Sequence, residues 1–138
     1  MPHRRMADII RRSPVTLPAS ATVQQACQLM RQHRIGAILV VDAHGHLEGI
    51  FTGRDTVRLL ADGKNASHAQ LHSVMTHAPN YLPPQHSAMD ALRLMHDGGF
   101  RHVPVVEHGR VVGIVSHGDF ASFEHARLDD ETGIWERL

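Results

Sequence analysis

The chain has 138 residues, of which 42% are hydrophobic and 20% are charged, so we expect a packed core in one compact domain or two small adjoining ones, and not a disordered chain. Because 14 Lys and Arg balance 14 Asp and Glu, the charge gives no reason to expect binding to nucleic acid or to an anionic membrane. No apolar run approaches the ~20 residues of a membrane span, and the N-terminal segment is too polar for a signal peptide. The single cysteine, Cys27, fits a reducing compartment. We therefore expect a cytoplasmic protein.

The first half of the chain predicts a strand, a helix, two strands and a second helix, in that order. Thr22 has the side-chain oxygen that caps a helix, apolar residues then recur at helical spacing, and Gly36 is expected to end that helix. The apolar run at 37–41 has the length of a strand that is buried on both faces. The predicted elements are an extended segment at 15–17, a helix between 22 and 36, strands at 37–41 and 47–52 joined by a tight turn at 42–45, and a helix at 54–60.

The second half of the chain predicts the same elements again. Ser87 caps its first helix, and the pair Gly98-Gly99 ends that helix. The remaining predicted elements are a hairpin of strands at 103–106 and 111–115 that turns at 108–109, and a last helix anchored by Phe120 and Phe123.

The two halves are copies of one another. Pro14 aligns with Pro79 at an offset of 65 residues, and Asp55 aligns with Asp119 at an offset of 64, because one residue is lost in a predicted turn. The repeat predicts a first unit at residues 7–62, a linker at 63–70, a second unit at 71–125 and a tail at 126–138. The apolar residues of that tail either pack on their own chain or form a dimer contact; they are Ile134, Trp135 and Leu138.

Each half carries the motif Gly-x-x-Thr/Ser-x-x-Asp where a buried strand becomes a helix. At a helix start the free N–H groups favour a phosphate, a hydroxyl can donate to that phosphate, and a carboxylate can accept from both hydroxyls of a ribose. For one copy alone a plain helix cap is the better interpretation, but two copies at equivalent places favour a ligand site. The copies are Gly49, Thr52 and Asp55 in the first half and Gly113, Ser116 and Asp119 in the second, with Arg54 and His117 as added positive charge.

With both motifs and the Val-Pro-Val-Val sequence at 103–106, the chain resembles the cystathionine-beta-synthase (CBS) domain, a family found as tandem pairs. The resemblance covers Ala7 to Phe123. It implies an α/β (α+β) fold in which two pseudo-symmetric β-α-β-β-α repeats pack through their sheets, with two related clefts between them. Such pairs commonly bind AMP, ADP, ATP, a dinucleotide or S-adenosylmethionine, and they often form a disc-like homodimer.

The resemblance also implies roles for particular residues. Asp55 and Asp119 match the carboxylates that bind ribose, and Thr52 and Ser116 match the hydroxyls beside ribose and phosphate. Gly36 and Ala37 stand in the first repeat where the second has Arg101 and His102, which implies that the two clefts differ in their affinity for anions. The other implied ligand-binding positions are Arg54, His117, Arg101 and His102 at the phosphate, Thr16 and Tyr81 at the adenine, and Ile50 and Ile114 as apolar walls.

We therefore expect a regulatory module that binds an adenine nucleotide and acts on a separate effector protein. AMP is the first choice because the cleft has few basic residues, and NAD(H) or ATP comes next. The alternative is a structural dimerisation module with empty clefts.

Neither catalysis nor a metal site is expected from the sequence. Cys27 lies on the apolar face of a predicted helix, where cysteine is usually inert, and neither a nucleophile elbow nor a Walker phosphate loop occurs. The histidines offer no recognised metal motif, although two pairs are closely spaced; these are His44 with His46 and His68 with His72.

Overall fold

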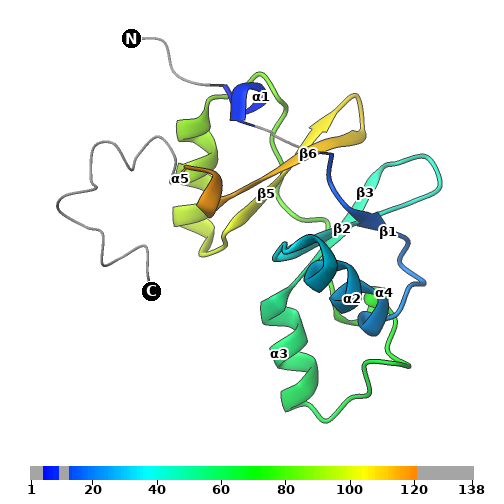
Figure 1. Cartoon of the computed structure of the whole chain (residues 1–138). Helices are drawn as coiled ribbons and strands as arrows, with labels where there is room; N and C mark the ends of the chain where they lie inside the picture. The colour runs from blue at the N-terminus through cyan, green and yellow to red at the C-terminus, as the bar shows by residue number, and fades with distance from the viewer. Residues whose placement is uncertain (1–4, 10–12, 121–138) are drawn as a thin grey trace, which may run out of the picture.

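The two halves of the chain fold into two lobes that lie side by side in the computed structural model (Figure 1). The structure describes residues 5–9 and 13–120. The first half contains β1 (Thr16–Leu17), α2 (Val23–His33), β2 (Ala37–Val41), β3 (Leu47–Thr52) and α3 (Gly53–Ala61). The second half contains α4 (Leu71–Val74), β4 (Thr76–His77), α5 (Ala88–Gly98), β5 (His102–Glu107), β6 (Arg110–Ser116) and the 3-10 turn η1 (His117–Phe120), and α1 (Met6–Ile9) precedes both halves.

The strands form one sheet in each lobe. In the first sheet the order is β1-β2-β3-β4, in which β1 runs parallel to β2 and the other neighbours are antiparallel. In the second sheet β5 and β6 form an antiparallel hairpin. Both hairpins carry a register shift at the same aligned position, between Val40 and Val41 in one and between Val105 and Val106 in the other. The predicted strands are thus confirmed, and the repeat extends to an irregularity of the backbone.

The short helices at the start of each half are exchanged between the lobes. Met6 of α1 is fully buried among Ala91, Met95 and other residues of the second half, and its N–H donates to the His86 carbonyl at 2.9 Å. Leu71 of α4 occupies the matching place against the first half, where its N–H donates to the Ala21 carbonyl at 2.8 Å. We therefore define the first lobe as β1 to β4 with α2 to α4, and the second lobe as α1 with α5, β5, β6 and η1.

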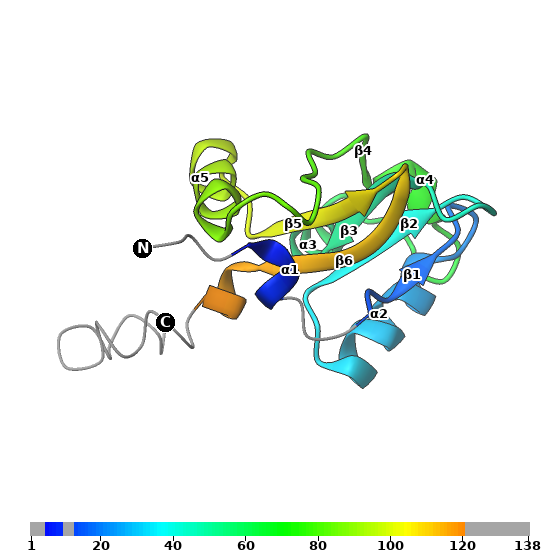
Figure 2. The same cartoon turned by 90° about the horizontal axis from the view of Figure 1, so that it is seen from above.

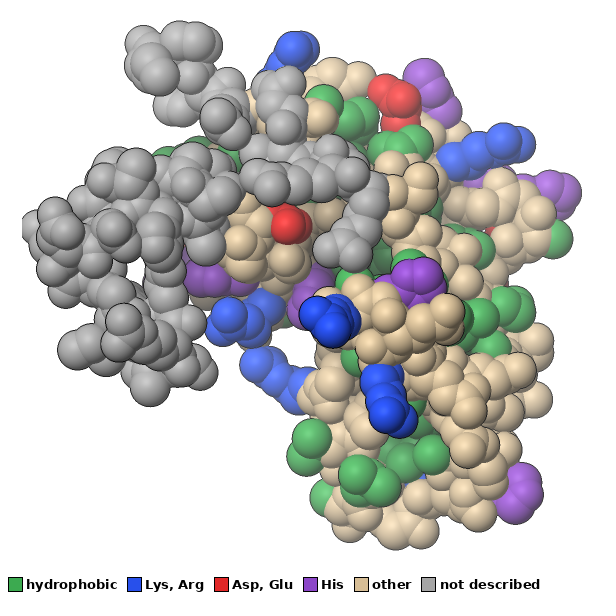
Figure 3. Space-filling view, viewed as in Figure 1, with side chains coloured by type: hydrophobic (Ala, Val, Ile, Leu, Met, Phe, Trp, Pro, Cys, Tyr) green, Lys and Arg blue, Asp and Glu red, His purple; other side chains and the backbone are tan. Residues whose placement is uncertain are grey.

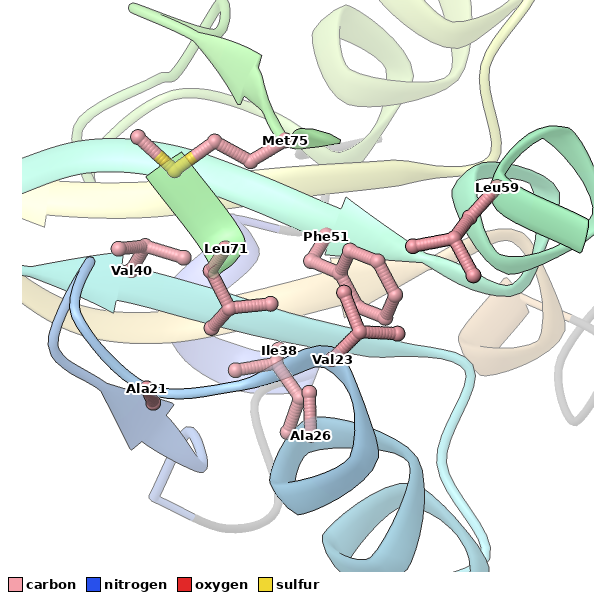
Figure 4. Close-up of a cluster of buried hydrophobic side chains, with 9 residues drawn as sticks. All are labelled: Ala21, Val23, Ala26, Ile38, Val40, Phe51, Leu59, Leu71 and Met75. Atoms are coloured by element: carbon pink, nitrogen blue, oxygen red, sulfur yellow. The ribbon is translucent and has the colours of Figure 1, made fainter. Parts of the chain in front are cut away.

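The core of the first lobe forms around Phe51, which is fully buried between β3 and the helices (Figure 4). Val23 and Ala26, one helical turn apart on α2, are also fully buried against it. The start of α2 is capped as predicted, because Thr22 Oγ1 accepts from the Gln25 N–H at 3.1 Å and the Gln25 side chain accepts from the Thr22 N–H at 2.8 Å.

The predicted end of α2 at Gly36 is wrong. The helix ends at His33, and Arg34 takes the left-handed conformation, with φ of 56°. Its N–H still bonds to carbonyl groups of the last turn, which offsets the strain of a non-glycine residue there. Gly36 serves a different steric purpose, because a Cβ atom at this position would lie 3.3 Å from Nε2 of His102.

The second lobe follows its predicted elements as far as residue 120. Ser87 Oγ accepts from the Asp90 N–H at 3.1 Å at the start of α5, and Gly99 ends the helix with φ of 71°. His108 and Gly109 turn the hairpin, both with positive φ as a two-residue turn of type I′ requires. The predicted last helix begins as the 3-10 turn η1, and the rest of it and the apolar tail residues lie outside the described residues.

The two lobes meet through their sheets. The buried residues Ala37, Leu39 and Ile50 of β2 and β3 form one cluster with Val111 and Ile114 of β6, and the β5–β6 hairpin lies across β2 and β3 (Figure 2). The Val111 N–H also donates to the Gly45 carbonyl at 3.1 Å, which connects the turn of the first hairpin to the start of β6, just after the turn of the second. The predicted packing through the sheets is confirmed. In the part of the chain that the structure describes, no helix has the length and apolar character needed to cross a membrane.

Replacing Met6 with Ala tests the exchange of the short helices. Because Met6 is fully buried in the second lobe, we expect Met6→Ala to lower the free energy of unfolding by about 2–5 kcal/mol, measured by urea denaturation. Met89→Ala is the matched control, since Met89 is 49% exposed and its loss should change stability by less than about 0.5 kcal/mol. Equal effects of the two variants would contradict this placement of α1.

Candidate functional site

Two pockets lie where the lobes meet. The first, here called the Asp55 pocket, has a volume of about 470 Å³ and is lined by the end of β3 and the start of α3 on one side and by residues 98–102 of the second lobe on the other. The second, the Asp119 pocket, has a volume of about 200 Å³ and is lined by the end of β6 and η1 together with residues 13–15 and 34–37 of the first lobe. Each pocket therefore takes its Thr/Ser-x-x-Asp motif from one lobe and its opposite wall from the other.

The two pockets are aligned copies of one pocket. At the offset of 64 residues, Thr52 and Asp55 of the first correspond to Ser116 and Asp119 of the second. At the offset of 65 residues, Arg101 corresponds to Gly36, and the segment 78–80 corresponds to 13–15. The pockets therefore share their framework, although the motif leads into the α-helix α3 in the first and into the 3-10 turn η1 in the second.

Asp55 is the only charged residue among the buried residues of the described chain, with 4% of its surface exposed. Its Oδ2 accepts from the Thr52 N–H at 2.9 Å and from the Thr52 hydroxyl at 3.4 Å. Its Oδ1 lies 3.5 Å from Nη1 of Arg58. A buried carboxylate is unfavourable without such partners, and these contacts hold it at the start of α3.

Asp119 repeats this arrangement in the second lobe. Its Oδ2 accepts from the Ser116 N–H at 2.7 Å and from the Ser116 hydroxyl at 3.1 Å. The motif therefore has one geometry in both copies, in which the carboxylate folds back on the residue that ends the strand. A carboxylate oriented in this way can accept further hydrogen bonds from hydroxyl groups of a ligand.

Among the described residues, the Asp55 pocket is lined by more Lys and Arg side chains than the Asp119 pocket. Arg54 and Arg58, one turn apart on α3, and Arg101 from the second lobe all line it. Arg54 Nη1 donates to the Gly99 carbonyl at 3.2 Å, so this side chain connects the two lobes at the pocket. On the face shown in Figure 3, Lys and Arg side chains gather where the lobes meet. In the Asp119 pocket the only Lys or Arg among the described lining residues is Arg34.

His102 lines both pockets and separates them. Its ring packs on the backbone of Gly36, where no Cβ is present. Burial lowers the pKa of His102, nearby Arg101 lowers it further, and the carboxylate of Asp119 opposes them. The ring is therefore neutral at neutral pH.

The structure brings together most of the residues that the sequence predicts for binding. In the Asp55 pocket these are Ile50, Thr52, Arg54, Asp55, Arg101 and His102, and in the Asp119 pocket they are Ile114, Ser116, Asp119 and again His102. Their roles in binding stay predictions.

Three predicted residues line neither pocket: Thr16, Tyr81 and His117. Thr16 is paired with Leu39 in the sheet, and Tyr81 is 52% exposed. The pocket walls are instead formed by the preceding segments, 13–15 and 78–80.

Sequence reasoning missed Arg58 and Arg34. The spacing of Arg58, four residues after Arg54, places both on one face of a helix and was a usable signal. Arg34 had no such signal, because it lies just after the end of α2 and reaches the pocket only through the left-handed turn of the backbone there.

The histidine pairs considered for a metal site and Cys27 lie outside both pockets. Among residues 5–9 and 13–120, no group of three or more His, Cys, Asp or Glu is placed to hold a metal ion. The rings of His44 and His46 lie 6.0 Å apart, beside Asp42. Cys27 Sγ lies 3.5 Å from Thr56 Oγ1 between α2 and α3, and Cys27 lines neither pocket.

Two lobes that build the same pocket twice define the chain as a tandem domain pair. The family model described as "CBS domain" matches residues 6–62 and 71–125. The chain belongs to the CBS domain family, as its motifs indicated.

Individual relatives agree with this assignment. The CBS domain-containing protein YhcV of Bacillus subtilis is 37% identical over 107 residues, which cover 77% of this chain and 75% of that protein. The CBS domain-containing protein CBSCBSPB1 of Arabidopsis thaliana is 35% identical over 102 residues, which cover 73% of this chain but 19% of that protein. The chain thus spans about a fifth of the length of its plant relatives.

A solved structure shares the whole arrangement. The CBS domain pair of protein MJ0100, in complex with 5′-methylthioadenosine and S-adenosyl-L-methionine, superposes with a TM-score of 0.84 at 27% identity. The superposition covers 91% of this chain and 99% of that one. That domain pair therefore binds adenosine derivatives in the same fold.

The lowered pKa of His102 predicts a dependence of stability on pH. The unfolded chain takes up a proton at the ordinary histidine pKa of about 6.5, whereas the buried ring resists protonation until a lower pH. The unfolded state therefore binds more protons in that interval, and the contribution of His102 to stability is lost as pH falls below about 6.5. We expect the stability difference between the wild type and His102→Gln to shrink from neutral pH to about pH 5, measured by urea denaturation at each pH.

The control for this measurement is His68→Gln, which removes an exposed imidazole from the loop before α4. A pH-dependent stability difference as large for His68→Gln as for His102→Gln would contradict the role of burial at His102.

Proposed function

We propose that this chain is a regulatory module that binds an adenine nucleotide in the Asp55 pocket, with AMP preferred over NAD(H) and ATP. The observation that carries the proposal is a buried, hydrogen-bonded carboxylate that shares one pocket with three arginines. A ribose and a phosphate are the two polar parts of a nucleotide, and this pocket has a group suited to each. The MJ0100 domain pair, which binds two adenosine derivatives, supports the adenosine part of the proposal.

Asp55 is proposed to hold the ribose. Its Oδ2 accepts from the Thr52 N–H, and its Oδ1 faces the exposed side chain of Arg58. Arg58 is 63% exposed, and an ion pair of this kind contributes little, so a ribose hydroxyl can replace it at small cost. Thr52 then supports the carboxylate and does not need to move.

The arginines are proposed to hold the phosphate, and their number favours AMP. Arg54, Arg58 and Arg101 together with Asp55 leave a charge of about +2 in the pocket, which matches the −1.5 to −2 of a phosphate monoester near pH 7. A triphosphate brings more negative charge than these side chains supply. S-Adenosylmethionine brings positive charge, which three arginines disfavour.

The proposed role is regulation without catalysis. A ligand in the Asp55 pocket contacts both lobes, so its differential affinity for two arrangements of the lobes would shift their populations. A separate effector protein would read that shift. We propose no chemical step on the ligand, because the lining groups bind and neutralise charge.

A dimerisation module with empty pockets is the second candidate. Val57 and Leu60, three residues apart on α3, are 66% and 64% exposed, which is unusual for apolar residues on one helix and suits a protein contact. Such a surface is also where the proposed disc-like homodimer would form. A chain that dimerises in solution, yet gives no heat with any nucleotide, would favour this second candidate.

Calorimetric titration with AMP, ATP, NADH and S-adenosylmethionine tests the proposed function. We expect AMP to bind most tightly. Asp55→Asn and Arg101→Gln should each weaken AMP binding by about 1–3 kcal/mol, the usual effect of losing hydrogen bonds to a charged group. Asn at position 55 retains an acceptor for the Thr52 N–H, so the fold should be kept, and circular dichroism can verify this.

Arg93→Gln is the matched control, because Arg93 is an exposed arginine on α5 that lines neither pocket. Its affinity for AMP should equal that of the wild type. Unchanged AMP affinity in Asp55→Asn would refute the assignment of the ribose to Asp55.

A further inference from the structure

One titratable side chain, His102, lies between the two pockets. Its ring lines both of them, and the Nε2 edge of the ring packs on Gly36, where a Cβ atom would approach it to 3.3 Å. In the second sheet His102 is paired with Ser116, the hydroxyl residue of the second motif. The ring is therefore held where the lobes meet, next to any charge that enters either pocket.

Charged and titratable residues occur on each element packed around this ring. Arg101 precedes it on the chain, and His117 of η1 donates its N–H to the Arg101 carbonyl at 2.8 Å. Arg11 and Arg12 lie outside the described residues, and for this reason the experiment titrates the ring itself. The other charged residues that share a pocket with the ring are Arg54, Asp55 and Arg58 in the Asp55 pocket and Arg34 and Asp119 in the Asp119 pocket.

The protonation of the ring depends on the charge of its neighbours. Burial and Arg101 lower the pKa of His102, whereas the carboxylate of Asp119 raises it. A phosphate bound by Arg101 cancels the charge of that arginine and places negative charge in a pocket that the ring lines. Both changes favour the imidazolium form, which the carboxylate of Asp119 already favours from the other pocket.

We propose that His102 is a proton switch: its ring takes up a proton when a phosphate enters the Asp55 pocket, so the chain binds its nucleotide more tightly as the pH falls from about 7.5 to about 6. The proposal rests on the proposed function, since it takes the Asp55 pocket to be the site of the phosphate. It adds the proton concentration as a second input to a module that otherwise responds only to a nucleotide.

The proton and the phosphate favour each other's binding in this arrangement. Because the nucleotide-bound chain holds the proton up to a higher pH than the free chain, the affinity rises as the pH falls through the pKa of His102 in the bound chain. The rise ends below the pKa of His102 in the free chain, which lies under the ordinary histidine value of about 6.5. The sensitive pH window is the interval between those two pKa values.

Titration of the histidine ring resonances by NMR tests the proposal on the wild-type full chain, without AMP and with saturating AMP. The resonance of His102 is assigned by its absence from the spectrum of His102→Gln. Its pKa should be higher in the AMP-bound chain by at least about 0.5. An unchanged pKa of His102 in a chain saturated with AMP would overturn the proton switch and leave the nucleotide function intact.

Calorimetry measures the consequence for affinity. The phosphate of AMP itself takes up a proton with a pKa of about 6, and a comparison with His102→Gln separates that titration from the titration of the ring. From about pH 7.5 to about pH 6, the AMP affinity of the wild type should gain about threefold relative to that of His102→Gln. The wild type should also take up more protons per AMP bound.

The matched control is His68→Gln, which removes an exposed imidazole that lines neither pocket. Its AMP affinity should follow the pH as that of the wild type does. If the wild type and His102→Gln show the same pH dependence, the ring does not couple protons to binding.

Inorganic phosphate as a second probe separates the proton switch from the proposed function. Absence of AMP binding would overturn the proposed function. A rise in the pKa of His102 with inorganic phosphate, and not with chloride at equal ionic strength, would then still support the switch. No rise with either AMP or inorganic phosphate would overturn the switch.

Discussion

The contact between the two sheets is the constraint on which the site depends. Leu39 and Ile50 of the first lobe are buried against Ile114 of the second, and burying side chains of this size stabilises the contact by about 1.5–3 kcal/mol each. The same three residues line the pockets, Ile50 in one and Leu39 with Ile114 in the other. The packing that joins the lobes therefore also shapes both pockets, which is why we propose that a ligand in a pocket acts on the contact between the lobes.

This arrangement explains why the chain needs two copies of its repeat. A single repeat supplies a motif that ends in Asp55 or Asp119, but the opposite wall of each pocket comes from the other lobe. The exchange of α1 and α4 makes each lobe depend on the other half of the sequence. Met6, from the first half, completes the core of the second lobe, and Leu71, from the second half, completes the core of the first lobe. Each lobe thus depends on the other half of the sequence for its core, and each pocket depends on both lobes for its walls.

Much of the fold followed from local sequence, because strands, caps and turns depend on neighbouring residues. The run at 37–41, the cap at Thr22 and the turn at His108 are of this kind. The end of α2 was mispredicted because Arg34, and not a glycine, takes the left-handed conformation that ends the helix. Hydrogen bonds from its backbone N–H to carbonyl groups of the last turn stabilise this conformation. The exchange of α1 and α4 was not predictable from the repeat, which shows that two segments are alike but not which lobe each one contacts.

The candidate site was predictable in its motifs and less so in its assembly. Thr52, Asp55, Ser116 and Asp119 stand in repeated positions, so alignment alone singled them out. That Arg101 faces the motif of the other lobe follows only from how the sheets cross. The adenine wall was expected around Thr16, which is paired in the sheet, and the pocket is lined by the residues just before it.

The central claim is that one ligand is held by both lobes at once, and an NMR titration of the 15N-labelled chain with AMP tests it most directly. The account predicts that amide resonances at 52–55 and at 99–102 shift together, along one saturation curve. Shifts confined to one lobe would contradict a pocket assembled from both.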